Sequence, residues 1–193
     1  MKVTGCILAG GRSSRFGSDK ALVVWHGKTL LAHAAERLRP QVDTIIINTN
    51  SDAPQYREPG HALVPDQTKS FEGPLAGVLA CLEWAARNGA DQLATAAVDT
   101  PLFPENLVAA FKKGAGKKII AAQSATGLHP TFALWPVSAG PALVSWLSSG
   151  QNRSMTDFLK SQSFEIMMFA DSGPLDPFFN INTPEDLALL SRS

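Results

Sequence analysis

The chain has 193 residues, of which 45% are hydrophobic and 18% are charged, with 17 basic and 17 acidic side chains. A chain of this length buries a sizeable core without help from metals or disulfides, and this composition excludes a disordered protein. The even charge balance argues against a broad basic surface, so we expect no nucleic-acid partner.

The apolar segments are too short for a membrane span, and the cysteines are too few for a disulfide framework. No run approaches the roughly 18 apolar residues that a membrane span needs, and the first residues do not read as a signal peptide. Cys6 and Cys81 each lie in an apolar run, which predicts two buried packing residues. We therefore expect a cytoplasmic protein without a membrane partner.

The first half of the chain alternates between strand and helix patterns. Apolar and β-branched runs predict strands over residues 3–8, 44–47, 62–64 and 93–98. Apolar residues at helical spacing predict helices over residues 30–38, 75–87 and 105–113. This alternation predicts an α/β fold: a Rossmann-like, doubly wound, mostly parallel sheet with helices on both faces.

The second half is less regular. Strands are predicted over residues 119–122, 131–135 and 164–169, and helices over residues 138–147 and 154–160. Thr183 as the N-cap, followed by Pro184 and two acidic residues, predicts a last helix. No linker or internal repeat interrupts the chain, so we expect residues 1–193 to form a single domain.

A glycine-rich stretch follows the first predicted strand, with glycines in residues 8–11 and at Gly17. Open α/β sheets bind ligands beyond the carboxyl ends of their strands, and glycines let backbone N–H groups turn toward phosphate oxygens. Arg12, Arg15 and Lys20 add three positive charges. The glycine spacing matches neither the dinucleotide-binding fingerprint nor a P-loop. The stretch therefore predicts a distinct triphosphate-binding loop.

Asp99 follows the fourth predicted strand. In the strand order 3-2-1-4 of doubly wound folds, the first and fourth strands flank a crevice, so we expect Asp99 to face the glycine-rich loop. Mg²⁺ is held by one or two carboxylates together with water and phosphate, which makes Asp99 the candidate metal ligand and Asp66 a second candidate. A turn or capping role at Asp99 is the structural alternative.

Two more stretches precede predicted helices. Residues 73–77 open a helix whose first N–H groups suit an anion or a base edge. Asn180 and Asn182 offer donors and acceptors for a polar heterocycle, or simply shape the start of the last helix. His129 precedes a strand, and both a structural role and a place at the substrate edge are open. The sequence shows no recognisable Ser-His-Asp arrangement. This agrees with a reaction in which an acceptor phosphate is itself the nucleophile and needs no general base.

Together these stretches resemble the molybdenum cofactor guanylyltransferase family, within the wider nucleoside-triphosphate transferase superfamily. The matching residues are Leu8 to Gly11, Arg15, Gly17, Asp19, Lys20, Asn48, Asp66, residues 73–77, Asp99 to Pro101, His129-Pro130 and residues 180–184. The stretches at 73–77 and 180–184 look specific to the molybdopterin branch. Phe16 and Val98 depart from the family's usual methionine and cysteine or alanine, which concerns packing more than chemistry.

The resemblance implies a nucleotidyltransferase that moves GMP from GTP to the terminal phosphate of molybdopterin and releases pyrophosphate. It implies a nucleotide site made of Leu8, Ala9, Gly10, Gly11, Lys20, Asn48, Asp66 and Asp99, and an acceptor site made of Arg15, Gly77, Asn180 and Asn182. Catalytic roles fall to Arg15, Lys20 and Asp99, with Asp99 on Mg²⁺. Molybdenum insertion proteins and chaperones of apo-molybdoenzymes are the implied partners.

Three other functions stay open at this point. A cytidylyltransferase for the same cofactor and a sugar-phosphate nucleotidyltransferase would use the same chemistry on other substrates. A non-catalytic carrier would bind the pterin without reacting it. Asp99 together with Lys20 favours an enzyme, because a carrier would need neither.

Overall fold

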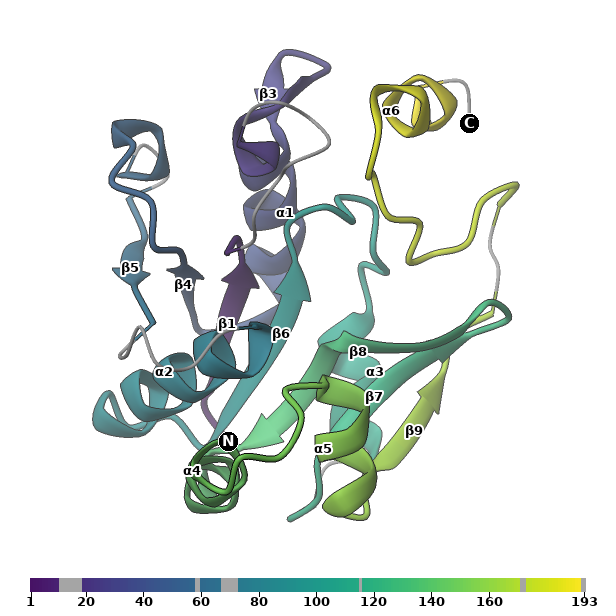
Figure 1. Ribbon diagram of the computed structural model, residues 1–193. Coiled ribbons are helices and arrows are strands. Elements are labelled where there is room, and N and C mark those ends of the chain that lie inside the picture. The colour runs from purple at the N-terminus through teal and green to yellow at the C-terminus, as the bar shows by residue number, and fades with distance from the viewer. Residues whose placement is uncertain (11–18, 58–59, 67–72, 115, 171–172, 192–193) are drawn as a thin grey trace.

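The computed structural model describes residues 1–10, 19–57, 60–66, 73–114, 116–170 and 173–191. Within them, seven strands form one sheet in the order β5-β4-β1-β6-β8-β7-β9 (Figure 1). The strands are β1 (Val3–Leu8), β4 (Thr44–Asn48), β5 (Ala62–Val64), β6 (Gln92–Ala97), β7 (Ile120–Ser124), β8 (Gly127–Pro136) and β9 (Glu165–Met168). Of these seven, β8 pairs antiparallel with both neighbours and the other pairs are parallel. The prediction of a mostly parallel sheet is confirmed.

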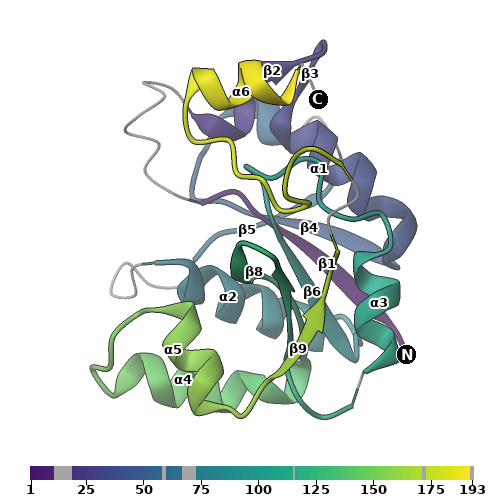
Figure 2. The same ribbon diagram turned by 90° about the vertical axis from the view of Figure 1, so that its right-hand side faces the viewer.

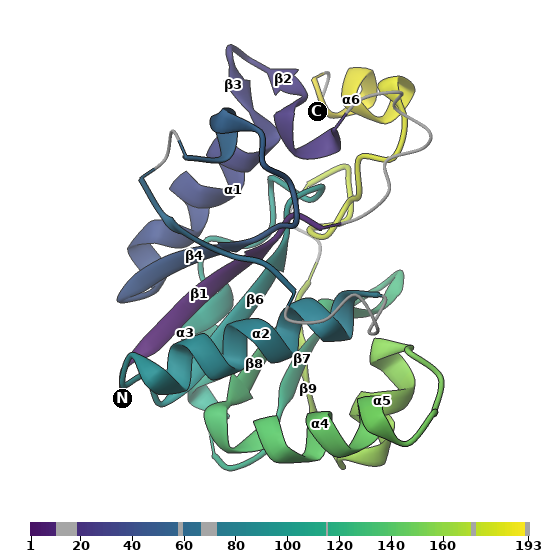
Figure 3. The same cartoon turned by 60° about the vertical axis from the view of Figure 1, so that its left-hand side comes forward.

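Helices cover both faces of the sheet. They are α1 (Leu30–Leu38), α2 (Pro74–Arg87), α3 (Leu107–Lys113), α4 (Gly140–Ser148), α5 (Met155–Ser161) and α6 (Pro184–Leu190). Helices α1 and α3 share one hydrophobic cluster with the sheet, and α2, α4 and α5 share another on the opposite face (Figure 2, Figure 3). This is the doubly wound α/β architecture that the alternating pattern predicts.

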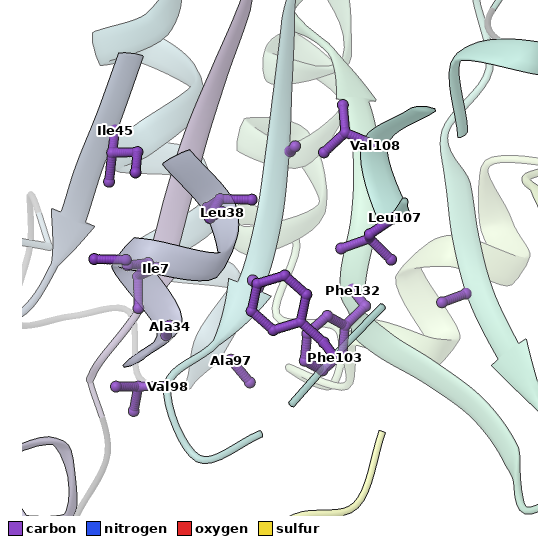
Figure 4. Close-up of a cluster of buried hydrophobic side chains, with 14 of the residues drawn as sticks. Ile7, Ala34, Leu38, Ile45, Ala97, Val98, Phe103, Leu107, Val108 and Phe132 are labelled. Atoms are coloured by element: carbon purple, nitrogen blue, oxygen red, sulfur yellow. The ribbon is translucent and has the colours of Figure 1, made fainter. Parts of the chain in front are cut away.

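The centre of the molecule is apolar on both sides of β1 and β6. All six residues of each strand are buried, as expected for strands covered by helices on both faces. Ile7, Leu38 and Phe103 meet in the cluster between the sheet and the first helical layer (Figure 4). Cys6 and Cys81 are buried in the opposite cluster as free thiols, which confirms their prediction as packing residues.

A small hairpin and the last helix pack against each other beyond the sheet (Figure 2, Figure 3). The hairpin consists of β2 (Val24–Trp25) and β3 (Lys28–Thr29), two-residue strands that the sequence analysis did not predict. Leu30 and Leu190 form a third hydrophobic cluster there, and the Trp25 indole donates to the Ser191 hydroxyl at 2.9 Å. The N-terminal and C-terminal parts of the chain are therefore joined by direct contacts.

Element boundaries shift where tertiary pairing overrides the apolar pattern. Strands β7 and β8 extend toward each other into polar residues, because Ser124 pairs with Gly127 across a tight turn. The helix predicted to begin at residue 138 begins at Gly140, after a short 3-10 helix. The 3-10 helices are η1 (Lys20–Leu22), η2 (Arg39–Gln41), η3 (Pro54–Arg57) and η4 (Val137–Ala139). In the described part of the chain, no helix has the length and apolar character to cross a bilayer.

Candidate active site

A cleft of about 230 Å³ opens at the carboxyl ends of β1 and β6. The chain runs from β1 to β4 and β5 on one side and returns to β6 on the other, which confirms the strand order 3-2-1-4. Open α/β sheets bind ligands at such a switch point. The cleft is lined by Leu8, Ala9, Gly10, Asp19, Lys20, Ala21, Pro74, Ala97, Val98, Asp99, Thr131 and Asn180.

Lys20 lines this cleft and joins three distant segments of the chain. Its Nζ donates to Asp99 Oδ2 at 3.1 Å and to Asn182 Oδ1 at 3.0 Å. The side chains of Lys20 and Asp99 are 17% and 24% exposed, so this ion pair is partly shielded from water yet open to a ligand. The structure thus brings together a lysine after the glycine-rich loop, an aspartate after β6 and an asparagine before α6.

Asp19 explains the local conformation at Lys20. Its carboxylate accepts from the backbone N–H of Ala21 at 3.2 Å and so caps η1, the turn in which Lys20 is the first residue. The hydroxyl of Tyr56 lies 2.9 Å from both carboxylate oxygens of Asp19. Burial, followed by the Asp19 carboxylate, raises the pKa of Tyr56 well above its usual range, so the hydroxyl stays protonated and donates.

The C-terminal segment is hydrogen-bonded to the end of β6. The backbone N–H of Ile181 donates to the carbonyl of Asp99 at 2.8 Å, and the Thr100 hydroxyl donates to the Asn180 side chain. Asp186 Oδ2 accepts from the backbone N–H of Asn182 at 2.8 Å. It also takes part in a capping box with Thr183, which confirms the predicted start of the last helix. Asn180 and Asn182 are therefore held at the Asp99 side of the cleft.

Asn48 and Asp66 form a second polar group, at the ends of β4 and β5. Asn48 Nδ2 donates to the carbonyl of Val64 at 3.0 Å and to Asp66 Oδ1 at 2.9 Å. Asn50 donates to Asp66 Oδ2 at 2.8 Å and accepts from the Asp66 backbone N–H at 2.9 Å. Both carboxylate oxygens of Asp66 are thus oriented by amides. Asn48 and Asp66 were predicted from the sequence as site residues, and Asn50 was not.

Gly77 lies directly against Asn48. A Cβ added at Gly77 would be 2.1 Å from Asn48 Oδ1, a distance that two non-bonded atoms do not occupy. The structure therefore places Gly77, predicted for the acceptor side, beside a residue predicted for the nucleotide. Gly11 and Arg15, the remaining predicted site residues, lie outside the described residues.

His129 belongs to a hydrogen-bonded group that the sequence analysis did not anticipate. Ser124 Oγ lies 2.7 Å from His129 Nε2 and donates to Asp176 Oδ2 at 2.5 Å. Asp176 also accepts from Thr126 and from the backbone N–H of Phe178, while His129 stacks on the Phe178 ring. Asp176 Oδ1 is 3.8 Å from His129 Nε2, too far for a hydrogen bond, whereas Asp176 Oδ2 accepts directly from the Ser124 hydroxyl. This arrangement joins the β7–β8 hairpin to the segment before Asn180 and differs from a catalytic triad.

Burial sets the charge state of this group. Burial lowers the pKa of His129 below its usual value, and the nearby Asp176 carboxylate offsets this only in part. Burial raises the pKa of Asp176, but the hydrogen bonds from Ser124, Thr126 and Phe178 outweigh it and leave the pKa lowered. Near neutral pH the pair is therefore a neutral imidazole beside an ionised carboxylate.

Known proteins are similar to this chain in sequence and in fold. A family profile described as MobA-like NTP transferase domain matches residues 5–164. A Rhizobium meliloti protein named molybdenum cofactor guanylyltransferase is 44% identical over 189 residues, covering 94% of this chain and 87% of the relative.

Solved structures with lower sequence identity share the same architecture. Molybdopterin-guanine dinucleotide biosynthesis protein A from Archaeoglobus fulgidus has a TM-score of 0.74 at 21% identity, over 98% of this chain and 100% of that chain. Rv0371C from Mycobacterium tuberculosis, solved in complex with manganese, has a TM-score of 0.72 at 18% identity over 100% of both chains. At these identities the two structures show a common fold.

Proposed function

This chain belongs to the MobA-like NTP transferase family, and we propose that it transfers GMP from GTP to the terminal phosphate of molybdopterin. It is a nucleotidyltransferase: pyrophosphate leaves, and the guanine dinucleotide form of the cofactor results. The observation that carries this function is the 44% sequence identity, over 94% of this chain, to a protein named molybdenum cofactor guanylyltransferase. The cleft at the switch point of the sheet, with Lys20 and Asp99 in contact, supports it.

We assign the nucleotide to the side of the cleft formed by β1, β4 and β5. The backbone after Leu8, with Ala9, Gly10 and Gly11, receives the phosphates, and the Lys20 ammonium neutralises charge that develops on them. Asn48 and Asp66 hold the guanine, whose edge presents N–H donors to a carboxylate. The hydrogen bonds that orient Asp66 support this assignment, because a fixed acceptor discriminates between bases better than a mobile one.

We assign a divalent metal, Mg²⁺, to Asp99. Mg²⁺ is held by few carboxylates and fills its other positions with water and substrate phosphate. The donor set fits, because Asp99 places a carboxylate, the protein ligand that Mg²⁺ prefers, in the lining of the cleft. When bound, the metal neutralises the triphosphate and stabilises the leaving pyrophosphate. Two observations support Asp99 in this role: its carboxylate lines the cleft, and its Oδ2 contacts the positively charged ammonium of Lys20.

The acceptor occupies the other rim of the cleft. Asn180 and Asn182 are the candidate contacts there, together with Arg15 from the resemblance, whereas Gly77 lies beside Asn48 on the nucleotide side. A terminal phosphate is already an anionic nucleophile, so its oxygen bonds to the α-phosphorus while the bond to the β-phosphate oxygen breaks. This step needs alignment and charge neutralisation and no general base. Arg15 and Lys20 supply the positive charge.

The cellular setting is part of the same proposal. Molybdenum insertion proteins would act next to this enzyme, and chaperones of apo-molybdoenzymes would receive its product. Residues 1–193 act as one nucleotidyltransferase domain. Two unbridged thiols suit the reducing cytoplasm.

The decisive experiment compares nucleotides and acceptors with one purified protein. GTP, Mg²⁺ and molybdopterin together should release pyrophosphate and yield the guanine dinucleotide, while CTP at the same concentration should not. Release with CTP would identify a cytidylyltransferase, and release with a sugar phosphate in place of molybdopterin would identify that branch of the superfamily. Binding of GTP and pterin without any pyrophosphate would indicate a carrier and refute the enzyme.

A further inference from the structure

Tyr56 has a polar contact that the proposed reaction does not use. It is the one tyrosine in the sequence and lies in η3, after β4. Its ring is fully buried in the cluster beneath α1, yet its hydroxyl reaches both carboxylate oxygens of Asp19 at 2.9 Å. A buried hydroxyl needs a partner, but a carboxylate at the rim of a cleft could be satisfied by water. The contact therefore satisfies the buried hydroxyl and also restricts where the Asp19 carboxylate lies.

Asp19 passes this constraint on to Lys20. The Asp19 carboxylate caps η1 through the N–H of Ala21, and Lys20 is the next residue along the chain. Lys20 extends from this turn to within 3.1 Å of Asp99 Oδ2. A small rotation of the turn would move the end of such a long side chain by about 1 Å, a displacement that can cost large factors in rate. Tyr56 itself does not line the cleft, so any effect on the reaction must be indirect.

We propose that Tyr56 is a positioning residue for Lys20, acting through the Asp19 carboxylate. The hydroxyl fixes Asp19, Asp19 fixes the first turn of η1, and that turn fixes where the Lys20 ammonium lies relative to the transferred phosphate. The inference rests on the proposed role of Lys20. It predicts that removing one oxygen atom from a buried side chain outside the cleft lowers the rate of the chemical step.

The first test is Tyr56→Phe, which keeps the ring and removes the hydroxyl. We expect kcat with GTP, Mg²⁺ and molybdopterin to fall about tenfold while KM for GTP changes less than about threefold. Thr95→Val is the matched control, because it also removes one fully buried hydroxyl, at a site away from the cleft lining. It should lower the melting temperature and leave kcat unchanged. A kcat of Tyr56→Phe within twofold of the wild type would overturn the proposal.

The second test asks whether the effect passes through Lys20. Lys20→Met alone should lower the single-turnover rate at least about 100-fold. If Tyr56 acts through the ammonium, adding Tyr56→Phe to Lys20→Met should cause no further loss. An additional tenfold loss in the double variant would show that Tyr56 acts by another route. Normal turnover of Lys20→Met would instead refute the proposed function of Lys20, and the two failures are thereby distinguished.

Asp19 variants keep the proposal testable if Tyr56→Phe does not fold. Asp19→Ala should lower kcat as much as Tyr56→Phe does. Asp19→Asn retains one side-chain oxygen for the Ala21 N–H and for the tyrosine hydroxyl, and so should restore most of the rate. Equal rates for wild type and Asp19→Ala would contradict a chain of contacts through this carboxylate.

Discussion

Asp99 stands at the carboxyl end of β6, with its Oδ2 3.1 Å from the Lys20 nitrogen. Asparagine at this position keeps the size and one oxygen but lacks the charge that attracts a divalent ion. Asp99→Asn should therefore require at least about tenfold more Mg²⁺ for half-maximal rate, and direct Mn²⁺ binding measured by electron paramagnetic resonance should weaken in parallel. Asp91→Asn, a 62% exposed aspartate at the amino end of the same strand, is the control and should titrate as the wild type does. An unchanged metal titration of Asp99→Asn would show that another carboxylate holds the metal.

Gly77 offers a second residue-level prediction. An alanine methyl would be 2.1 Å from Asn48 Oδ1, so the Asn48 side chain must move and lose its bonds to Val64 and Asp66. Gly77→Ala should lower the free energy of unfolding by about 1–3 kcal/mol, the cost of buried polar groups left unpaired. The dissociation constant for GTP, measured by calorimetry, should rise about tenfold. Gly140→Ala is the control, since nothing lies within 4 Å of its added methyl. Normal GTP binding by Gly77→Ala would contradict the placement of the base near Asn48.

Residue pairs show how far the sequence could predict this site. Lys20 and Asp99 were predictable because each follows a recognisable strand, and the fold rule for switch points places strand ends together. Tyr56 and Asp176 were not predictable, because each contacts its partner through a loop whose path no local pattern specifies. Gly77 was identified by resemblance, but its contact with Asn48 depends on how closely α2 approaches β4, which no local sequence pattern specifies.

The β7–β8 hairpin and the segment before α6 form a pH-sensitive junction at the scale of elements. Burial lowers the pKa of His129, so below about pH 6.5, its ordinary value in an unfolded chain, the unfolded state binds the proton more readily. The free energy of unfolding should then fall as the pH falls from about 7 to 5. His129→Gln should flatten this dependence in urea unfolding curves. Asp176 has a lowered pKa, so its contribution is lost only further down, below about pH 4, which separates the two groups.

A steeper dependence in His129→Gln than in the wild type would contradict this account of the junction.

Among the elements themselves, those with long apolar patterns were predictable from sequence, such as β1 and α2, whose predicted bounds match within a residue. The hairpin β2–β3 was not, because strands of two residues carry no periodicity. Its stability comes instead from Trp25, which packs against α6 and donates to Ser191.

At the scale of the whole molecule, the elements interlock along the chain. One sheet runs from β5 to β9, and α6 returns to the hairpin near the N-terminus. We therefore expect residues 1–193 to unfold as one unit in scanning calorimetry, with a calorimetric enthalpy equal to the van't Hoff enthalpy. GTP should raise the temperature of that one transition. Two separated transitions, of which GTP shifts only one, would divide the chain into two domains.

The contact between Lys20 and Asn182 also orders events during synthesis on the ribosome. The two residues are 162 positions apart, and at roughly 5–20 residues per second their emergence is separated by about 8–32 seconds. In the second half of that interval, once Asp99, 79 positions after Lys20, has been added, the nascent chain carries β1, the glycine-rich loop and Asp99, the segments that we propose bind the phosphates of the nucleotide. Asn180 and Asn182, which we propose for the acceptor side, are still to be translated. A growing chain can thus encounter GTP early, but the assembled cleft, and with it turnover, has to wait for the C-terminal segment to return.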